Sequence, residues 1–231
     1  MTLLEPPVAP EVTYVLTDLL RDRAAAEPDG TAFVVGRGPA VVATLGFSEW
    51  YERTEAAARA LAARGVRRGD RVGLFFERLE FVDYVLAYSA VLRVGAVAVH
   101  LPTTRASVAA HAGCVGVVRG GSREPAVATG DPAVWEAALA ALPDPGGAPL
   151  PRLDLTADDP ADVLWTSGTT GPARPGRTWP IGLLGQLAWC PRGDLKPLGR
   201  CLSPAALTLR QVGGGALLRV APGTSGLVCH G

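Results

Sequence analysis

Residues 161–174 have the sequence ADVLWTSGTTGPAR. The first part of this stretch, Ala161–Thr166, is largely apolar and ends in turn residues, which is typical of a buried β-strand. Glycines and hydroxyl-bearing residues follow, and glycine lets a backbone turn sharply and approach a ligand closely. The stretch therefore predicts a strand that leads into a loop with many hydrogen-bond donors.

Similar short apolar runs precede this strand along the chain. Strands are predicted at Arg71–Phe76, Ala96–Leu101 and Cys114–Val118, with helices at Ser48–Leu61 and Glu80–Arg93 between or before them. Near-continuous apolar strands separated by helices indicate βαβ units. The predicted fold class is therefore α/β, with a layered parallel sheet flanked by helices on both faces. Other elements are predicted at Tyr14–Glu27 (helix), Thr31–Val35 and Val41–Leu45 (strand pair), Ser107–Ala112 (short helix) and Trp135–Ala141 (helix).

The composition excludes several classes of protein. The chain has 231 residues, 48% of them hydrophobic, and a net charge of zero, which argues against intrinsic disorder and against binding nucleic acid through bulk charge. The most apolar window, Val82–Leu101, contains Asp83 and Arg93, so we expect no membrane span. The four cysteines form no CxxC pair, and no metal site is assigned. A cytoplasmic location is the expectation.

The character of the sequence changes near residue 177. Residues 1–177 hold 21 of the 22 acidic side chains, and only Asp194 lies beyond them. Three of the four cysteines follow the boundary, at Cys190, Cys201 and Cys229. We therefore predict an α/β part over 1–177 and an irregular, divergent tail over 178–231. A shifted reading frame is one hypothesis for the tail.

The loop after the last predicted strand has the chemistry of a phosphate site. Its threonines and serine supply hydroxyls, its glycines allow a concave nest of backbone amides, and Arg174 supplies a forked cation. It lacks the GxxxxGK[ST] pattern of the P-loop. The residues assigned to ligand binding are Thr166, Ser167, Gly168, Thr169, Thr170, Gly171 and Arg174.

The segment WTSGTTGPAR, residues 165–174, resembles the signature loop of the adenylate-forming superfamily of AMP-dependent synthetases and ligases. Three further segments resemble the same family: GVRRGDRV at 65–72, VLRVGAVAV at 91–99 and DDPAD at 158–162. The resemblance extends from about Tyr14 to Arg174. It implies the N-terminal part of the family's large domain, and thus an incomplete N-terminal subdomain.

The resemblance implies ATP-dependent ligation of a carboxylic acid to a thiol. The acid would attack the α-phosphate of ATP, with Mg²⁺ as cofactor, to give an acyl-AMP, and coenzyme A is the implied acceptor. The loop would hold the β- and γ-phosphates. At the end of the loop Ala173, Arg174 and Pro175 stand where the family has proline, lysine and glycine.

Several motifs of the family are missing from this sequence. No Tyr-Gly-x-Thr-Glu pattern occurs, residues 178–231 contain no glutamate, and Lys196, the only lysine, has no lid-like surroundings. No catalytic residue is assigned, and His100 is interpreted as a structural or pocket-rim residue. Three hypotheses stay open: a truncated acid–CoA ligase that is incompetent alone, a non-catalytic remnant or interaction module, and one piece of a split ligase. Self-association or a complementing chain would cover the apolar surface that missing strands leave.

Overall fold

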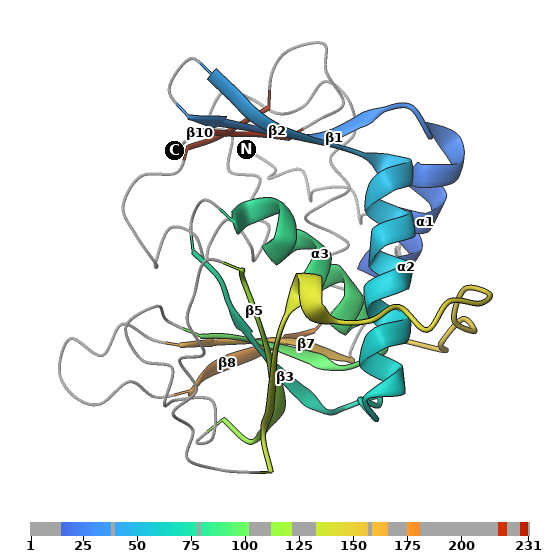
Figure 1. Cartoon of the computed structure of the whole chain (residues 1–231), viewed down its shortest axis with the longest axis vertical. Helices are drawn as coiled ribbons and strands as arrows, with labels where there is room; N and C mark the ends of the chain where they lie inside the picture. The colour runs from blue at the N-terminus through green and yellow to red at the C-terminus, as the bar shows by residue number, and fades with distance from the viewer. Residues whose placement is uncertain are drawn as a thin grey trace, which may run out of the picture.

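Two β-sheets and three α-helices make up the part of the chain that the computed structural model describes (Figure 1). The described residues are 15–37, 40–77, 80–101, 112–121, 133–156, 159–165, 175–180, 217–220 and 227–230. The helices are α1 (Leu16–Ala26), α2 (Phe47–Ala63) and α3 (Phe81–Arg93).

The larger sheet contains the strands that the sequence pattern predicts. Its strand order is β6-β5-β3-β4-β7-β8, formed by β3 (Arg71–Phe75), β4 (Val97–His100), β5 (Cys114–Arg119), β6 (Trp135–Ala138), β7 (Pro160–Trp165) and β8 (Pro175–Pro180). The first five strands are parallel, and β8 pairs antiparallel with β7 at the edge. A parallel sheet flanked by helices is thus confirmed.

The central strands β3 and β4 are buried almost from end to end, as strands covered on both faces must be. Tight packing on the face away from α3 explains one glycine. A Cβ at Gly73 would lie 2.9 Å from Leu101 Cδ1 and 3.0 Å from Val117 Cγ2. Leu101 and Val117 belong to a core cluster with Val99, Cys114 and Val163. Gly73 therefore lets apolar side chains of the adjacent strands meet across β3.

Helix α3 lies on the opposite face of this sheet and contacts α1 and α2 as well (Figure 1). Its residues are buried without a break from Tyr84 to Leu92, which confirms that it is covered on more than one side. The helix ends at Gly95, whose φ is +73°: Gly95 donates to the Leu92 carbonyl, and Ala96 donates to the Val91 carbonyl. This pair of bonds is a Schellman motif, and it turns the chain directly into β4.

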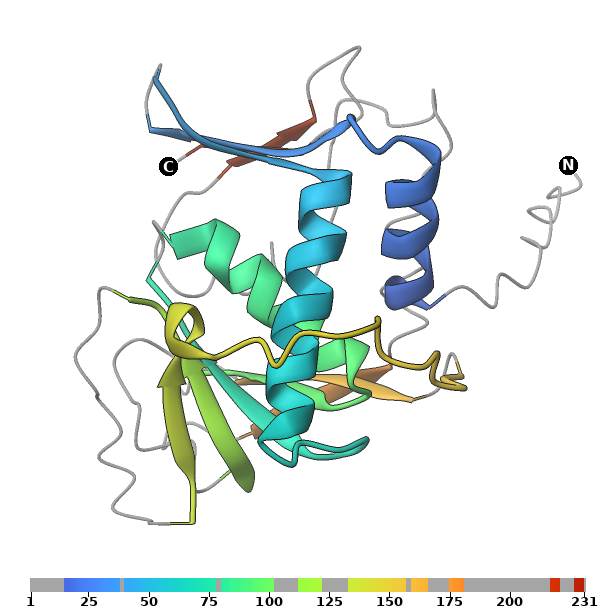
Figure 2. The ribbon, with the colours of Figure 1, turned by 45° about the vertical axis from the view of Figure 1, so that its right-hand side comes forward.

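A segment of extended chain, residues 143–156, crosses the helices before entering β7 (Figure 2). Charged side chains bind it at several points. Arg59 on α2 donates to both carboxylate oxygens of Asp144, at 2.9 and 2.7 Å, and so lowers the pKa of Asp144. Arg152 donates to Asp18 on α1 at 2.7 Å. The 143–156 segment is thus fastened to the helical layer that covers the sheet.

The smaller sheet has the order β2-β1-β10-β9. Its antiparallel pair, β1 (Thr31–Arg37) and β2 (Ala40–Gly46), confirms the predicted strand pair. The other two strands, β9 (Leu217–Val220) and β10 (Leu227–His230), come from the tail that we expected to be irregular. β8 spans residue 177, and the boundary placed there stays a prediction.

One predicted helix is wrong. Residues 135–141 form the edge strand β6 and a turn of 3-10 helix at Leu139–Ala141, not an α-helix. Alanine, leucine and glutamate all favour a helix, but helix propensity is small per residue, and pairing with β5 outweighs it. Trp135 stands opposite Gly116 in the register, and a Cβ at Gly116 would lie 2.0 Å from the Trp135 indole. The indole therefore occupies the space above Gly116, an arrangement that sequence spacing alone does not reveal.

The start of α2 also differs from the prediction. The helix begins at Phe47, with Gly46 as N-cap, and Ser48 makes no capping bond; its hydroxyl contacts Glu52 at 3.3 Å instead. The helix ends at Ala63, two residues beyond the predicted end, and is closed by Gly65, which has φ +87° and donates to the Ala62 carbonyl, while Val66 donates to the Leu61 carbonyl. The predicted helix at Ser107–Ala112 falls almost wholly outside the described residues.

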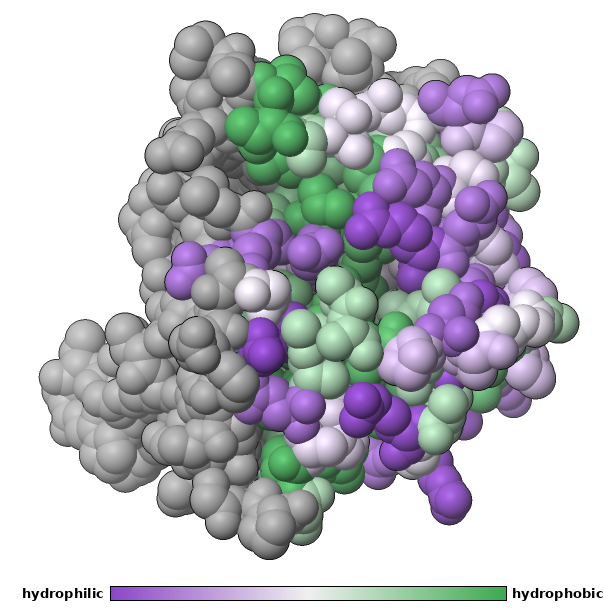
Figure 3. All heavy atoms as spheres, in the orientation of Figure 1, coloured by the Kyte–Doolittle hydropathy of each residue, from purple (hydrophilic) through white to green (hydrophobic). Residues whose placement is uncertain are grey.

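The face shown in Figure 3 mixes polar and apolar side chains over the helices and the sheet edge. An apolar area lies over the β1–β2 hairpin, where Val41 and Val42 are 63% and 54% exposed. No helix among the described residues is long and apolar enough to cross a membrane.

Candidate functional site

The carboxyl ends of five parallel strands, β3 to β7, meet along one edge of the larger sheet. Ligands of open parallel sheets bind beyond this edge, because the loops there face outward and helix N-termini point toward it. β7 is the outermost of these parallel strands, between β4 and the antiparallel edge strand β8. The residues that follow β7 therefore leave the sheet at its ligand-binding edge.

All seven predicted phosphate-binding residues lie outside the described residues, within 166–174. The strands on either side are described. Trp165 on β7 is the register partner of Pro175 on β8, so residues 166–174 connect two neighbouring antiparallel strands. The assignment of Thr166, Ser167, Gly168, Thr169, Thr170, Gly171 and Arg174 stays a prediction.

Directly before this segment, β7 carries a buried carboxylate. Asp162 has no exposed surface, and its Oδ1 lies 2.6 Å from Nε2 of His100, the last residue of β4. The His100 side chain is 2% exposed. Asp162 is paired in register with Ala98, two residues before His100, so both polar side chains face α3. The two strands are thus joined by a side-chain bond as well as by their backbones.

Two tyrosines of α3 complete this buried network. Tyr88 donates its hydroxyl to Asp162 Oδ2 at 3.0 Å, and the Tyr84 hydroxyl lies 2.9 Å from His100 Nδ1. The two phenol rings stack with centroids 6.2 Å apart and planes 4° apart. Burial, together with the neighbouring Asp162 carboxylate, raises the pKa of Tyr88 well above its ordinary value, so this hydroxyl stays protonated and remains a donor.

This buried network has a structural role at the ligand-binding edge of the larger sheet, and we assign it no chemical step. Its four members come from β4, β7 and α3, and each is buried in the described part of the chain. A hydrogen-bonded carboxylate with two donors has few other orientations open to it. The arrangement therefore holds β7 against β4 and α3 close to the point where the predicted phosphate loop begins.

Sequence reasoning missed Tyr84, Tyr88 and Asp162, and it interpreted His100 only as a structural or pocket-rim residue. The available signal was Asp162 itself, an acid inside a strand that is otherwise apolar. A buried acid requires a partner, and His100 at the end of the adjacent strand is the partner that parallel pairing brings close.

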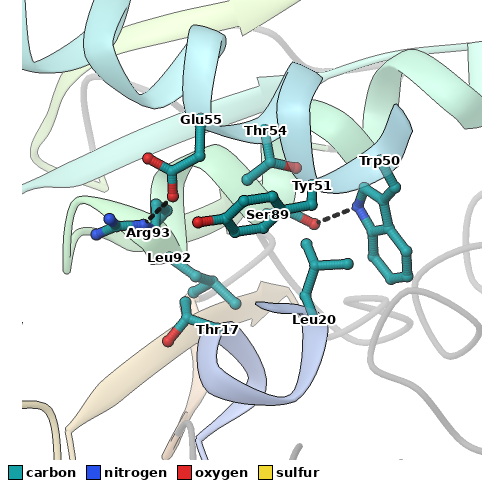
Figure 4. A pocket seen from close by; sticks show the side chains of 9 residues that line it. All are labelled: Thr17, Leu20, Trp50, Tyr51, Thr54, Glu55, Ser89, Leu92 and Arg93. Carbon is teal, nitrogen blue, oxygen red and sulfur yellow. Dashed lines mark hydrogen bonds and ion pairs between the residues drawn. The ribbon is translucent and has the colours of Figure 1, made fainter. Parts of the chain in front are cut away.

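A small pocket lies apart from this edge, among α1, α2 and α3 (Figure 4). Its lining includes Trp50, whose indole N–H donates to Ser89 Oγ at 3.0 Å, and the buried Thr54, whose hydroxyl has no hydrogen-bond partner among the described residues. The volume is about 10 Å³, which is the space of a single water molecule. This pocket is therefore a packing gap in the helical layer and too small for a nucleotide or an acyl chain.

Other reactive groups of the described residues carry no site. Cys114, the first residue of β5, is buried in the core, and burial raises the pKa of its thiol to about 12. Within the described ranges, no three histidine, cysteine or acidic side chains gather where they could hold a metal ion. Mg²⁺ bound with a nucleotide needs only one or two protein carboxylates, because phosphate oxygens and water supply its other ligands. A cluster of three such side chains is therefore not required for it, and no described residue is assigned to Mg²⁺.

Comparison with known proteins gives the same assignment as the motif. The family model described as "AMP-binding enzyme" matches residues 20–174. Two curated relatives are each 34% identical: nonribosomal peptide synthetase NPS2 of Ceriporiopsis subvermispora and hybrid PKS-NRPS synthetase mycA of Thermothelomyces thermophilus. The matches cover 55% and 60% of this chain but only 5% and 4% of those proteins.

Solved structures share the fold at low sequence identity. The N-terminal subdomain of Klebsiella oxytoca NpsA has a TM-score of 0.63 and 20% identity, covering 77% of this chain and 45% of that chain. O-succinylbenzoate coenzyme A synthetase (MenE) from Bacillus subtilis, in complex with AMP, has a TM-score of 0.62 and 22% identity, again over 77% and 45%. The likeness confirms the predicted architecture of an N-terminal subdomain of the adenylate-forming fold.

Proposed function

This chain belongs to the AMP-binding enzyme family over residues 20–174, and from that premise we propose that it supplies the ATP-phosphate-binding part of an ATP-dependent acid–thiol ligase. The observation that supports the proposal is the position of β7. Its carboxyl end lies at the ligand-binding edge of a parallel sheet, and the residues that follow it are the hydroxyl- and glycine-rich segment TSGTTGPAR.

In the proposed reaction a carboxylate oxygen attacks the α-phosphorus of ATP, and pyrophosphate leaves. A thiol sulfur, of coenzyme A in our proposal, then attacks the acyl carbon and AMP leaves. This chain's own contribution is to orient the polyphosphate. Hydroxyls and amides of Thr166–Gly171 would hold the β- and γ-oxygens, and the Arg174 guanidinium would neutralise their charge. Mg²⁺, when bound, would supply further neutralisation of the phosphates.

Equilibrium binding tests the phosphate assignment. We expect the full chain to bind Mg²⁺-ATP in a titration calorimeter with 1:1 stoichiometry. Arg174→Ala should weaken that binding by about tenfold or more, because a hydrogen bond between charged groups contributes about 1.5–3 kcal/mol. Arg177→Ala, a few residues further along, is the matched control and should bind ATP like the unaltered chain. Equal loss in both variants would contradict the assignment of Arg174.

Pyrophosphate exchange tests the reaction itself. ATP–pyrophosphate exchange with a panel of carboxylic acids should show turnover if this chain activates an acid by itself. Binding of ATP without exchange would instead support one piece of a split ligase, or a non-catalytic nucleotide-binding module. Adding a candidate complementing chain, which restores exchange only in the split case, separates those two outcomes.

A further inference from the structure

The buried network of His100, Asp162, Tyr84 and Tyr88 has no part in the phosphate chemistry just proposed. Stability alone is a weak reason for it, because replacing both partners of a buried hydrogen bond by apolar groups of the same shape can be nearly neutral or even stabilising. Its place in the fold offers a better reason. It joins the last residue of β4 to β7, the strand whose end defines the ligand-binding edge.

We propose that His100 is a positioning residue: through Asp162 it fixes the carboxyl-terminal end of β7, and with it the ATP affinity of the residues that follow. The inference rests on the proposed function. It assigns no contact between His100 and the nucleotide, since His100 is buried.

The backbone pairing of β7 explains why such a residue is needed. β7 and β4 share two register pairs, Ala98 with Asp162 and Val99 with Val163. On its other side, β7 pairs with β8 through an irregular register that shifts twice. A ladder this short specifies register weakly, and a slip of one residue would turn every side chain of β7 to the opposite face. The bond from His100 to Asp162 opposes that slip.

The hydrogen bonds of the network fix the orientation of the His100 imidazole ring. Asp162 accepts from His100 Nε2 on one oxygen and from Tyr88 on the other, while Tyr84 occupies Nδ1 of the imidazole. Both ring nitrogens are therefore engaged, and the ring has one orientation. From Asp162 to the first residue after β7 the extended chain spans roughly 13 Å at about 3.3 Å per residue, so a shift at Asp162 displaces the start of the loop directly.

Two amide variants separate positioning from simple packing. In His100→Gln the side-chain nitrogen reaches about as far as Nε2 and can still donate to Asp162, whereas in His100→Asn the same amide is one carbon shorter and falls short. We expect His100→Gln to bind Mg²⁺-ATP within threefold of the unaltered chain. We expect His100→Asn to bind at least tenfold more weakly.

A variant without the whole network addresses the stability question. Tyr84→Phe, Tyr88→Phe, His100→Leu and Asp162→Leu together remove every polar group of the network, so none of them is left without a partner. This combined variant should unfold within a few degrees of the unaltered chain and still bind ATP at least tenfold more weakly. ATP affinity equal to that of the unaltered chain would mean that the network is only structural and would overturn the proposal.

Hydrogen exchange gives a readout that does not need ATP. Amides of residues 161–165 should exchange at least tenfold faster in His100→Asn than in His100→Gln, while amides of β3 stay unchanged as an internal control. This measurement decides the inference if the combined variant fails to fold, or if the unaltered chain binds no ATP and the proposed function fails. Equal exchange of β7 in the two amide variants would overturn the positioning role in either case.

Discussion

The ion pair of Glu55 on α2 with Arg93 on α3 allows a direct test of how the 143–156 segment is fastened. Glu55 is buried, with 3% of its side chain exposed, and accepts from the Arg93 guanidinium and from the Leu150 amide at 3.0 Å. Arg93 also donates to the carbonyls of Leu150 and Pro151. Figure 4 shows the pair beside the helical pocket.

Replacing Glu55 with alanine should lower the free energy of unfolding by about 3 kcal/mol. Breaking a buried pair by removing one partner costs about 3–5 kcal/mol, because the remaining charge stays buried. The lower end applies here, since Arg93 keeps its two carbonyl acceptors and is 14% exposed. For a domain of this size that loss corresponds to a fall in unfolding temperature of roughly 6–12 °C.

The same helix provides a matched control. Glu49 pairs with Arg53 at 2.9 Å, and both side chains are about half exposed, at 50% and 46%. Exposed ion pairs contribute about 0.2–1 kcal/mol to stability, so Glu49→Ala should lower the unfolding temperature by at most about 4 °C. Thermal unfolding followed by circular dichroism compares the two variants. If the unfolding temperatures of Glu55→Ala and Glu49→Ala lie within 2 °C of each other, the reasoning that burial determines how much these ion pairs stabilise the fold is refuted.

Three further predictions concern the sheet. Gly116→Ala should destabilise the chain by about 1–3 kcal/mol in urea unfolding, because its methyl group displaces the Trp135 indole, whereas Gly121→Ala, with open space around its Cβ, should change little. Native Cys114 should resist alkylation at pH 8, as measured on its peptide by mass spectrometry. Because folding raises the pKa of this thiol from about 9 to about 12, its contribution to the free energy of unfolding is complete below pH 9 and is lost as the pH rises toward 12. Cys114→Ala should therefore lose less stability between pH 9 and pH 12 than the unaltered chain does. Tyr88→Phe should lower the free energy of unfolding by about 1.5–3 kcal/mol in the same urea assay, since Asp162 loses a buried donor; no change would mean that Asp162 finds another.

Most of the larger sheet could be predicted from sequence, for a physical reason that particular residues show. Arg71–Phe75 and Cys114–Arg119 are short, largely apolar runs that follow glycine-containing turns, a composition typical of parallel strands covered on both faces. The ends of α2 and α3 lie within two residues of the predicted ones, because a left-handed glycine, at 65 and 95, closes each helix locally. Signals that depend on neighbours in sequence were sufficient for these elements.

Features that depend on contacts between residues distant in the sequence could not be predicted from the sequence. Trp135 favours a strand because its indole covers Gly116, which belongs to another strand. Ser48 has the residue type of an N-cap, yet the helix begins one residue earlier, where Phe47 joins the core. His100 and Asp162 acquire a role only when parallel pairing brings β4 and β7 side by side.

The same distinction applies to the ligand site. A motif such as TSGTTG supplies the hydroxyls and amides that a polyphosphate requires, but those groups bind well only when the strand before them is held in one register. In this chain the proposed donors lie in one short run of sequence, while the side chains of the network around β7 come from α3, β4 and β7. Affinity for ATP should therefore depend on His100 as well as on Arg174, although only Arg174 belongs to the motif. Loss of affinity in Arg174→Ala but not in His100→Asn would show that the motif acts without this support.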